Sequence, residues 1–454
     1  MNTLNPSRKP AAVRRAGGYL FLLAGFHPSY RHRTMRAVVC ALWVLTTASC
    51  AHAAASLTLL TWLPGDNFNY NTTGVSGDGS VVVGTSGNDY VSSIPTSAYR
   101  WTAGSGMVGL GGYDSSASGV SADGSVIVGT SDYVAFRWTA GTGMVGLGYL
   151  PGGTYSGANG ISADGSVIVG TSYSASGNQA FRWTAGSGMV GLGYLPGGNS
   201  SSASGVSADG SVIVGTSGSA SGNQAFRWTA GSGMVGLGHL PGTTNSSATG
   251  VSADGSVIVG ASASVSVSQA FRWTAGSGMV GLGYLPGGNS SSATAVSGDG
   301  SIVVGNVLGN YGYDVAFRWT AGSGMQSLWD VLVTNGLNVD PADWLIASGI
   351  SADGNTIVGT YYVEATDFTL EFGFVATLPG LIGVSPVLSI NSWSSTAHQL
   401  VLSWSTNYPG CTLQSSTNLG STNWTDCASP TVSGASFVVT NSMSAGAQFF
   451  RLKQ

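Results

Sequence analysis

One carboxylate recurs along the chain in the same short phrase, and carboxylates are well suited to binding cations. The phrase reads S-A-D-G or S-G-D-G, and its aspartates are Asp78, Asp123, Asp164, Asp209, Asp254, Asp299 and Asp353. A calcium loop needs several oxygen ligands close together, whereas each phrase supplies one carboxylate. An Asp-Gly pair also provides the positive φ of a hairpin turn. We therefore expect turn residues, with a cation site as the alternative, and predict no metal site and no cofactor.

A second charged residue recurs as an Arg-Trp pair. The arginines are Arg100, Arg137, Arg182, Arg227, Arg272 and Arg318, six of the eight basic residues after residue 56. Such a set could form a ring of ligand contacts. A half-buried arginine is more usually retained because a carboxylate pairs with it. We therefore predict a structural role, with each arginine paired to the turn aspartate of its own repeat.

Catalytic constellations are not recognisable in this sequence. After the N-terminal segment only His239 and His398 remain, which is too few for a zinc site, and no G-x-S-x-G phrase occurs. Two loose acidic groups lie outside the repeats: Asp330, Asp340 and Asp343, and Glu364, Asp367 and Glu371. We predict a non-enzymatic binding protein with no catalytic residue. A polysaccharide-active hydrolase or lyase, which would need paired carboxylates, and a purely structural surface layer are the alternatives.

Four residues at equivalent places could bind a ligand. They are Tyr149, Tyr194, His239 and Tyr284, each in the loop that joins one repeat to the next. These connecting loops vary in length and content, whereas the Asp-Gly turns hardly vary, and insertions in repeat proteins tend to map to the binding face. The sequence predicts an aromatic arc that stacks on sugars, with simple capping of the repeats as the alternative. Candidate partners are glycans or cell-surface and matrix components.

The elements that carry these residues are short strands. In one repeat, four apolar or small-residue runs cover 202–207, 212–215, 225–229 and 234–240, separated by turn residues. Four antiparallel strands in about 45 residues form one blade of a β-propeller.

The number of repeats and their ends predict a closed ring. The seventh repeat stops near 374–378 without a fourth strand, and 57–65 matches the fourth strand of a repeat such as 190–197. Pairing the N-terminal strand with the last blade leaves no exposed sheet edge. We therefore predict an all-β fold, a seven-bladed β-propeller over 56–380 closed by the N-terminal strand, with a linear β-solenoid as the alternative.

The repeats resemble the bacterial extracellular repeat, HAF family. The likeness lies in the phrases S-A-D-G-S-V-I-V-G and A-F-R-W-T-A-G, the latter at 180–186, 225–231 and 270–276, and it covers roughly 57–380. The histidine of the family's name is replaced here, by Gln179, Gln224 and Gln269 in three repeats. The resemblance implies export and repetition and no assigned reaction, and any property of that histidine would be absent.

The first 55 residues read as a targeting segment. A basic start, an apolar run over 37–45 and an A-x-A site near 51–55 are typical of a secretory signal, with Met35 as the alternative start. The run is too short to span a bilayer, and we expect no transmembrane segment in the exported chain. All 19 acidic residues but only 8 basic ones follow it, a net charge of −11, which argues against nucleic acid. We expect an extracellular or cell-surface location.

The sequence after the repeats differs in character. Residues 387–454 alternate apolar and polar residues between turns, which predicts a small β-sandwich and resembles the fibronectin-III-like modules of secreted bacterial proteins. Cys411 and Cys427 are the cysteines left after export and are expected to form a disulfide. An insert at 326–336 has apolar residues at helical spacing. It predicts a short helix on the sixth repeat, with a lid as the alternative.

Overall fold

The computed structural model describes most of the chain beyond residue 54. The described residues are 55–64, 66, 68–87, 95–175, 177–309, 313–337, 344–364, 369–378, 389–394, 399–405, 412–416, 425–433, 436–442 and 449–453. The targeting segment and Cys411 lie outside them. The chain forms two compact units, one spanning residues 52–381 and one that contains residues 382–454.

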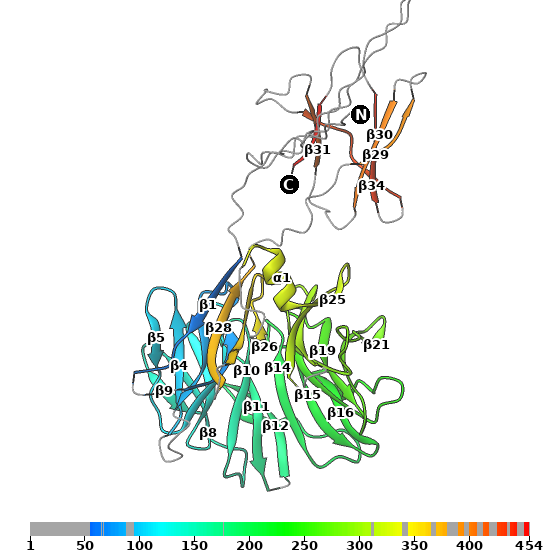
Figure 1. The fold of residues 1–454 in the computed structure, drawn as a ribbon. Helices are drawn as coiled ribbons and strands as arrows, with labels where there is room; N and C mark the ends of the chain where they lie inside the picture. Colours follow the sequence, from blue (N-terminus) through cyan, green and yellow to red (C-terminus); the bar gives the residue numbers. More distant parts are fainter. Residues whose placement is uncertain are drawn as a thin grey trace, which may run out of the picture. The chain divides into compact units, whose positions relative to one another are not determined.

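The first unit is built from four-stranded antiparallel sheets that stand side by side (Figure 1). Their sequential strands are β2 (Phe68–Val75), β3 (Val82–Gly87), β4 (Ser97–Thr102), β5 (Gly106–Gly109); β6 (Ser115–Val120), β7 (Val126–Ser131), β8 (Val134–Thr139), β9 (Gly143–Gly146); β10 (Ser156–Ile161), β11 (Ile168–Ser174), β12 (Gly177–Thr184), β13 (Gly188–Gly191); β14 (Ser201–Val206), β15 (Ile213–Ser219), β16 (Gly222–Thr229), β17 (Gly233–Gly236); β18 (Asn245–Val251), β19 (Val257–Ala263), β20 (Ser268–Thr274), β21 (Gly278–Gly281); β22 (Ser290–Val296), β23 (Ile302–Leu308), β24 (Asp314–Thr320) and β25 (Gly324–Ser327). One parallel pair, Ser268 with Ser290, joins the fifth and sixth of these sheets. The fold is all-β and propeller-like, with one predicted repeat per sheet.

A further sheet contains strands from both ends of the unit. Its order is β1-β28-β27-β26, with β1 at Ser56–Leu60, β26 at Trp344–Ile350, β27 at Thr356–Glu364 and β28 at Thr369–Thr377. Strand β1 runs antiparallel to β28, so that Ser56 lies opposite Thr377 and Leu60 opposite Gly373. The N-terminal strand therefore occupies the fourth place in the sheet of the seventh repeat.

Each second strand is buried on both faces because a neighbouring sheet packs against each side. In β15, Ile213 and Val214 have no exposed surface; Ile213 packs towards the preceding sheet and Val214 towards the following one. This arrangement explains the continuous apolar run V-I-V in the repeat, where a strand with one wet face would alternate. The glycine that follows is required sterically: a Cβ on Gly215 would lie 2.0 Å from the carbonyl oxygen of Ser202.

Main-chain hydrogen bonds link the seven turns in succession. In each turn the residue before the aspartate donates its N–H to the carbonyl oxygen of the equivalent residue in the next repeat, at 2.9–3.1 Å. The order of residues is Gly77, Ala122, Ala163, Ala208, Ala253, Gly298 and Ala352, and the N–H of Ala352 donates to the carbonyl oxygen of Gly77. The last bond of the series therefore returns to the first repeat.

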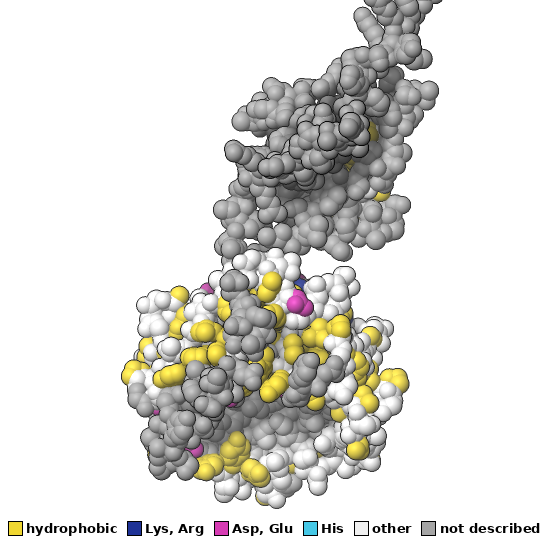
Figure 2. Space-filling view, viewed as in Figure 1, with side chains coloured by type: hydrophobic (Ala, Val, Ile, Leu, Met, Phe, Trp, Pro, Cys, Tyr) yellow, Lys and Arg dark blue, Asp and Glu magenta, His cyan; other side chains and the backbone are white. Residues whose placement is uncertain are grey.

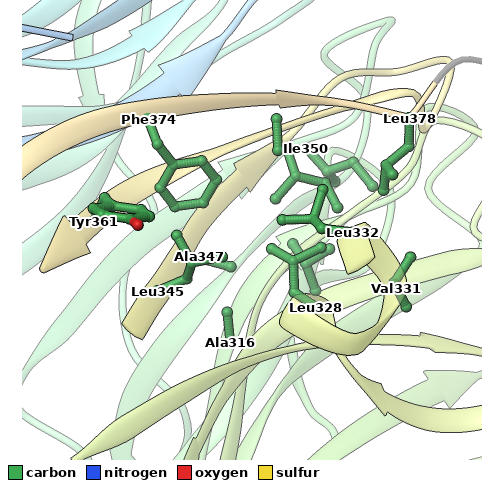
Figure 3. Packing of buried hydrophobic residues seen from close by; sticks show 13 residues of the cluster. Ala316, Leu328, Val331, Leu332, Leu345, Ala347, Ile350, Tyr361, Phe374 and Leu378 are labelled. Atoms are coloured by element: carbon green, nitrogen blue, oxygen red, sulfur yellow. The ribbon is translucent and has the colours of Figure 1, made fainter. Parts of the chain in front are cut away.

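The insert predicted to be helical is the helix α1, Leu328–Thr334. The Ser327 side chain caps it by accepting a hydrogen bond from the N–H of Asp330. Leu328 and Leu332 are fully buried and pack with Ala316 of β24 and with Leu345 of β26 (Figure 3). The helix therefore fills the junction between the sixth and seventh repeats, and this packing does not favour the alternative of a lid.

The second unit contains two antiparallel sheets that share one core. One sheet has the order β29-β30-β34-β33 (Ser389–Ser394, Gln399–Ser405, Ser436–Ser442 and Thr431–Ser433), and the other has β32-β31-β35 (Thr425–Asp426, Thr412–Ser416 and Phe449–Lys453). Leu402 and Val439 of the first sheet pack with Leu413 and Phe450 of the second. Cys427 is a half-buried free thiol in this structure. Because its predicted partner lies outside the described residues, the disulfide stays a prediction.

Candidate functional site

A pocket of about 770 Å³ lies where a turn of the second repeat meets the third repeat, with Ser202 of the fourth repeat also in its lining. Three tyrosines, Tyr133, Tyr155 and Tyr173, line it together with the polar side chains of Thr154, Asn159, Thr171, Asn178 and Ser202 and the backbone of Gly157. The aromatic residues come from the turn between β7 and β8, from the loop before β10 and from β11. These segments belong to the face that carries the connecting loops of variable length, where the sequence predicts a ligand.

Tyr133 is held in an unusual conformation. It and Asp132 form the two-residue turn between β7 and β8, and both have positive φ values, 64° and 45°. Such turns suit the twist of a hairpin but favour Gly, Asn or Asp at both positions. An aromatic residue there is strained, and 66% of its surface is exposed. Strain of this kind persists when the surrounding structure imposes it and is concentrated at functional sites.

The three tyrosine rings are arranged edge to face. The ring centroids of Tyr133 and Tyr155 are 6.4 Å apart, and those of Tyr155 and Tyr173 are 5.6 Å apart with an interplanar angle of 81°. The backbone holds the three residues together: Tyr133 accepts a hydrogen bond from the N–H of Ser156, and Tyr155 accepts one from the N–H of Tyr173, both at 2.9 Å. The pocket is therefore preorganised by main-chain contacts between two repeats.

The polar groups of the pocket are only partly used within the protein. Asn159 donates its side-chain N–H to the carbonyl oxygen of Ala203 at 2.8 Å, and the hydroxyls of Thr171 and Ser202 bond to each other at 2.5 Å. The side-chain oxygen of Asn178 is buried and accepts no hydrogen bond from the described residues. A buried polar atom without a partner is costly, so this oxygen is suited to accept a hydrogen bond from a ligand or water.

The four residues predicted to bind a ligand lie elsewhere. None of Tyr149, Tyr194, His239 and Tyr284 lines the pocket. Tyr149 is 40% exposed, and both ring nitrogens of His239 are buried without a hydrogen-bond partner among the described residues. Those four residues were predicted because they occupy equivalent positions in successive repeats. The three tyrosines of the pocket occupy non-equivalent positions. The sequence signal for those three was an aromatic residue at a place where the repeats diverge.

The predicted pairs between the repeated arginines and aspartates do not form, which is a correction to the sequence analysis. Each turn aspartate accepts a hydrogen bond from the serine two residues before it and from the backbone N–H two residues after it, as in Ser252, Asp254 and Ser256. In this example both donors bind the same carboxylate oxygen, Oδ1, and hold the carboxylate within its own turn. No arginine–carboxylate ion pair occurs among the described residues, and the Nε atoms of Arg272 and Arg318 are buried without a partner.

The serine contacts keep the turn aspartates ionised. Hydrogen bonding by the serine hydroxyl at the second residue before them lowers the pKa of Asp123, Asp209 and Asp254 to about 2, with the following serine N–H as the next cause. Burial alone lowers the pKa of Arg318 to about 10. Within the described part of the chain, no three His, Cys, Asp or Glu side chains come together as a metal site would require.

A second hollow of about 580 Å³ lies on the face with the Asp-Gly turns. Arg227, Arg272, Trp273 and Asp299 line it. Here the repeated arginines of two successive repeats line one hollow together with a turn aspartate. On the face seen in Figure 2, few charged side chains are visible among the described residues.

The comparisons with known proteins concern architecture. No family model matches the chain, and no curated protein matches its sequence. Similar solved structures include TolB from Acinetobacter baumannii, at 15% identity and a TM-score of 0.41 over 55% of this chain, and oligogalacturonate lyase from Vibrio parahaemolyticus, at 10% identity and 0.45 over 72% of this chain. The match covers 63% of the TolB chain and 98% of the lyase chain.

Prolyl endopeptidase is also similar, at 10% identity and a TM-score of 0.44, over 88% of this chain and 61% of that chain. At such identities no activity, ligand or partner is transferred to this chain from these structures. No helix in the described residues is long and apolar enough to cross a membrane.

Proposed function

We propose that this chain is an exported, non-enzymatic binding protein, built on a closed seven-bladed β-propeller, that binds carbohydrate in the pocket of Tyr133, Tyr155 and Tyr173. The observation that carries the proposal is the combination in one pocket of three exposed or half-exposed tyrosines with an unpaired, buried amide oxygen on Asn178. Small-ligand sites commonly combine aromatic surface with a few placed polar groups.

The closed ring is supported by three sets of contacts. The hydrogen bonds between successive turns return from Ala352 to Gly77, and β1 pairs with β28 of the seventh repeat. In addition, a Cβ on Gly79 of the first turn would lie 2.8 Å from the Cβ of Thr356 in the seventh repeat, just as a Cβ on Gly255 would lie 2.9 Å from the Cβ of Val212 one repeat earlier. A linear stack of repeats would have no such contact between its two ends.

The chemistry of the pocket suits a neutral sugar. A tyrosine ring offers an apolar face to the C–H groups of a pyranose and a hydroxyl at its edge. Asn159, Thr171 and Ser202 add amide and hydroxyl groups that both donate and accept hydrogen bonds. The described lining contains no Asp, Glu, His, Lys or Cys side chain, and its amide and hydroxyl groups suit hydrogen bonding to a sugar.

Export is part of the proposal and rests on the sequence of the first 55 residues. The resemblance of the repeats to the extracellular repeat, HAF family and of residues 387–454 to a fibronectin-III-like module agrees with a location outside the cell or on its surface. Glycans or other cell-surface and matrix components are then the partners most available to the pocket.

A glycan array followed by calorimetry tests the proposal. Neutral oligosaccharides are screened with the purified protein, and the best ligand is titrated into Tyr155→Ala and Tyr149→Ala proteins. Removing the ring of Tyr155 should weaken binding about tenfold, since a stacked ring contributes roughly 0.5–1.5 kcal/mol beyond the area it buries. Tyr149→Ala is the matched control, because this residue is exposed on the same face and does not line the pocket.

Equal affinities of wild-type and Tyr155→Ala proteins would refute the assignment of the pocket. Loss of binding with Tyr149→Ala alone would instead favour the arc of equivalent loop residues. Release of new reducing ends or unsaturated sugars from the same ligand would show that the chain is an enzyme and overturn the non-enzymatic part of the proposal.

A further inference from the structure

A second group of aromatic residues lies at the junction of the sixth and seventh repeats. Trp344 lies opposite Tyr362 across β26 and β27, and their rings stack with centroids 5.1 Å apart and planes 5° apart. Tyr313, immediately before β24, places its ring 4.7 Å from that of Trp344. The three rings form a column with Trp344 in the middle, and Tyr313 is 49% exposed. We call these residues the aromatic column.

Two carboxylates adjoin the aromatic column. Glu371 lies directly opposite Tyr362 across β27 and β28, so that Trp344, Tyr362 and Glu371 form one cross-strand row. Asp314 follows Tyr313 in the chain and is exposed. The pKa of Tyr362 is raised, first by burial and then by the charges of Glu371 and Asp314, which places both carboxylates within electrostatic reach of the column.

Basic residues are scarce in the sequence around the aromatic column, and the first one, Arg318, lies farther along β24. Residues 306–317 and 337–378 contain no Lys, Arg or His, whereas they include Asp314 and Glu371 as well as other acids. Aromatic faces attract cations, and nearby carboxylates strengthen that attraction. The pocket of Tyr133, Tyr155 and Tyr173 has no charged side chain in its described lining, so the two aromatic sites differ in the ligand charge they favour.

We propose that the aromatic column, with Asp314 and Glu371, is a second ligand site that recognises the ammonium group of an amino sugar. The outer face of Tyr313 supplies a platform for the sugar ring, and the neighbouring Asp314 accepts a hydrogen bond from the ammonium group. Glu371, beyond Tyr362 at the other end of the column, adds negative charge at longer range. An amino sugar is favoured over a lysine side chain because the platform can stack on a pyranose ring as well as contact its charge. The choice of a sugar rests on the proposed function, since both sites then bind parts of glycans.

The experiment compares two oligosaccharides that differ only in whether their amino groups are acetylated, and therefore in charge. Glucosamine tetramer and N-acetylglucosamine tetramer are titrated calorimetrically into the full protein at low ionic strength. The charged tetramer should bind about tenfold more tightly, because acetylation removes the cation–π and carboxylate contacts. Tyr313→Ala should weaken its binding about three- to tenfold and Asp314→Asn about two- to fivefold. Asp132→Asn removes a charge that is also exposed and lies beside Tyr133 of the other pocket, and it should leave this affinity unchanged.

Equal affinity for the two tetramers, or wild-type affinity in both Tyr313→Ala and Asp314→Asn, would overturn the inference. Trilysine binding as tight as that of the glucosamine tetramer would overturn the assignment to a sugar. Tyr155→Ala separates the two proposals, because it should weaken neutral-glycan binding without affecting the glucosamine tetramer. If Tyr155→Ala weakens neutral-glycan binding but the glucosamine and N-acetylglucosamine tetramers bind with equal affinity, the second site is refuted and the proposed function stands.

Discussion

The turn serines offer the sharpest test of how each repeat is stabilised. The hydroxyl of Ser252 is fully buried, donates a hydrogen bond to Asp254 at 2.6 Å and accepts one from the N–H of Val257 at 3.0 Å. Ser252→Ala removes both bonds and leaves the Val257 N–H without this acceptor. Val257 is 4% exposed, so water cannot readily replace the hydroxyl.

The expected loss of stability is about 2–4 kcal/mol. Leaving a buried donor unsatisfied costs about 1–3 kcal/mol, and the lost bond to Asp254 adds about 0.5–1.5 kcal/mol, the value for an ordinary bond, because water can rehydrate this exposed carboxylate. Ser256→Ala is the matched control: this serine lies in the same turn, but its side chain is exposed and its backbone N–H still donates to Asp254. The control should change stability by less than about 0.5 kcal/mol.

The assay is urea unfolding followed by circular dichroism at pH 7 and at pH 2. The Ser252 hydroxyl is the largest cause of the lowered pKa of Asp254, so its bond stabilises the fold above the ordinary aspartate pKa and is lost as the pH falls through about 2. The difference between wild-type and Ser252→Ala proteins should therefore shrink at pH 2, while the share from the Val257 N–H remains. Equal effects of Ser252→Ala and Ser256→Ala at pH 7 would refute this reasoning.

Four further expectations concern core packing, backbone strain and stability at low pH. Gly215→Ala should cost about 3 kcal/mol or more because its Cβ would overlap a carbonyl oxygen, whereas Gly231→Ala, with open space around it, should change stability little, as thermal unfolding would show. Leu60→Ala should cost about 2–4 kcal/mol in calorimetry, since this buried residue packs β1 against Val82 of the first repeat. Tyr133→Gly should retain or raise the melting temperature through relief of a positive φ while weakening glycan binding. Stability of the wild-type protein should hold down to about pH 4 and fall towards pH 2, as the turn aspartates become protonated.

Much of the fold could be predicted because each repeat contains the same local sequence pattern. The V-I-V run indicates a strand buried on both faces, and the unmatched strand at the N-terminus predicts a partner at the end of the seventh repeat. Strand β1 does pair with β28, at Ser56–Leu60. The apolar spacing of the insert likewise predicts α1. These features depend on periodicity, which a sequence displays directly.

The partners of the charged residues could not be predicted by comparing how many arginines and aspartates the repeats contain. Six arginines and seven aspartates suggested ion pairs, but the serines that flank each aspartate in S-A-D-G-S bond to it first. Side-chain hydrogen bonds within a turn join residues that are already close in the sequence. They therefore form more readily than ion pairs with distant residues. The serine two residues before each aspartate therefore indicates the partner of that aspartate.

The candidate site was harder to predict because it joins non-equivalent residues. Tyr133 lies in a turn, Tyr155 in a connecting loop and Tyr173 within β11, and only the packing of the second repeat against the third brings them together. Equivalence between repeats favours Tyr149 and its counterparts instead. Aromatic residues at positions where the repeats differ are the sequence feature that marks the pocket.

A crystal structure of the protein with its best neutral oligosaccharide would test the proposed site most directly. We predict a sugar ring in contact with Tyr155, between Tyr133 and Tyr173, and a hydrogen bond from a sugar hydroxyl to the side-chain oxygen of Asn178. A ligand bound instead beside Tyr149, or in the hollow between Arg227 and Arg272, with the tyrosine pocket holding only water, would contradict the proposal.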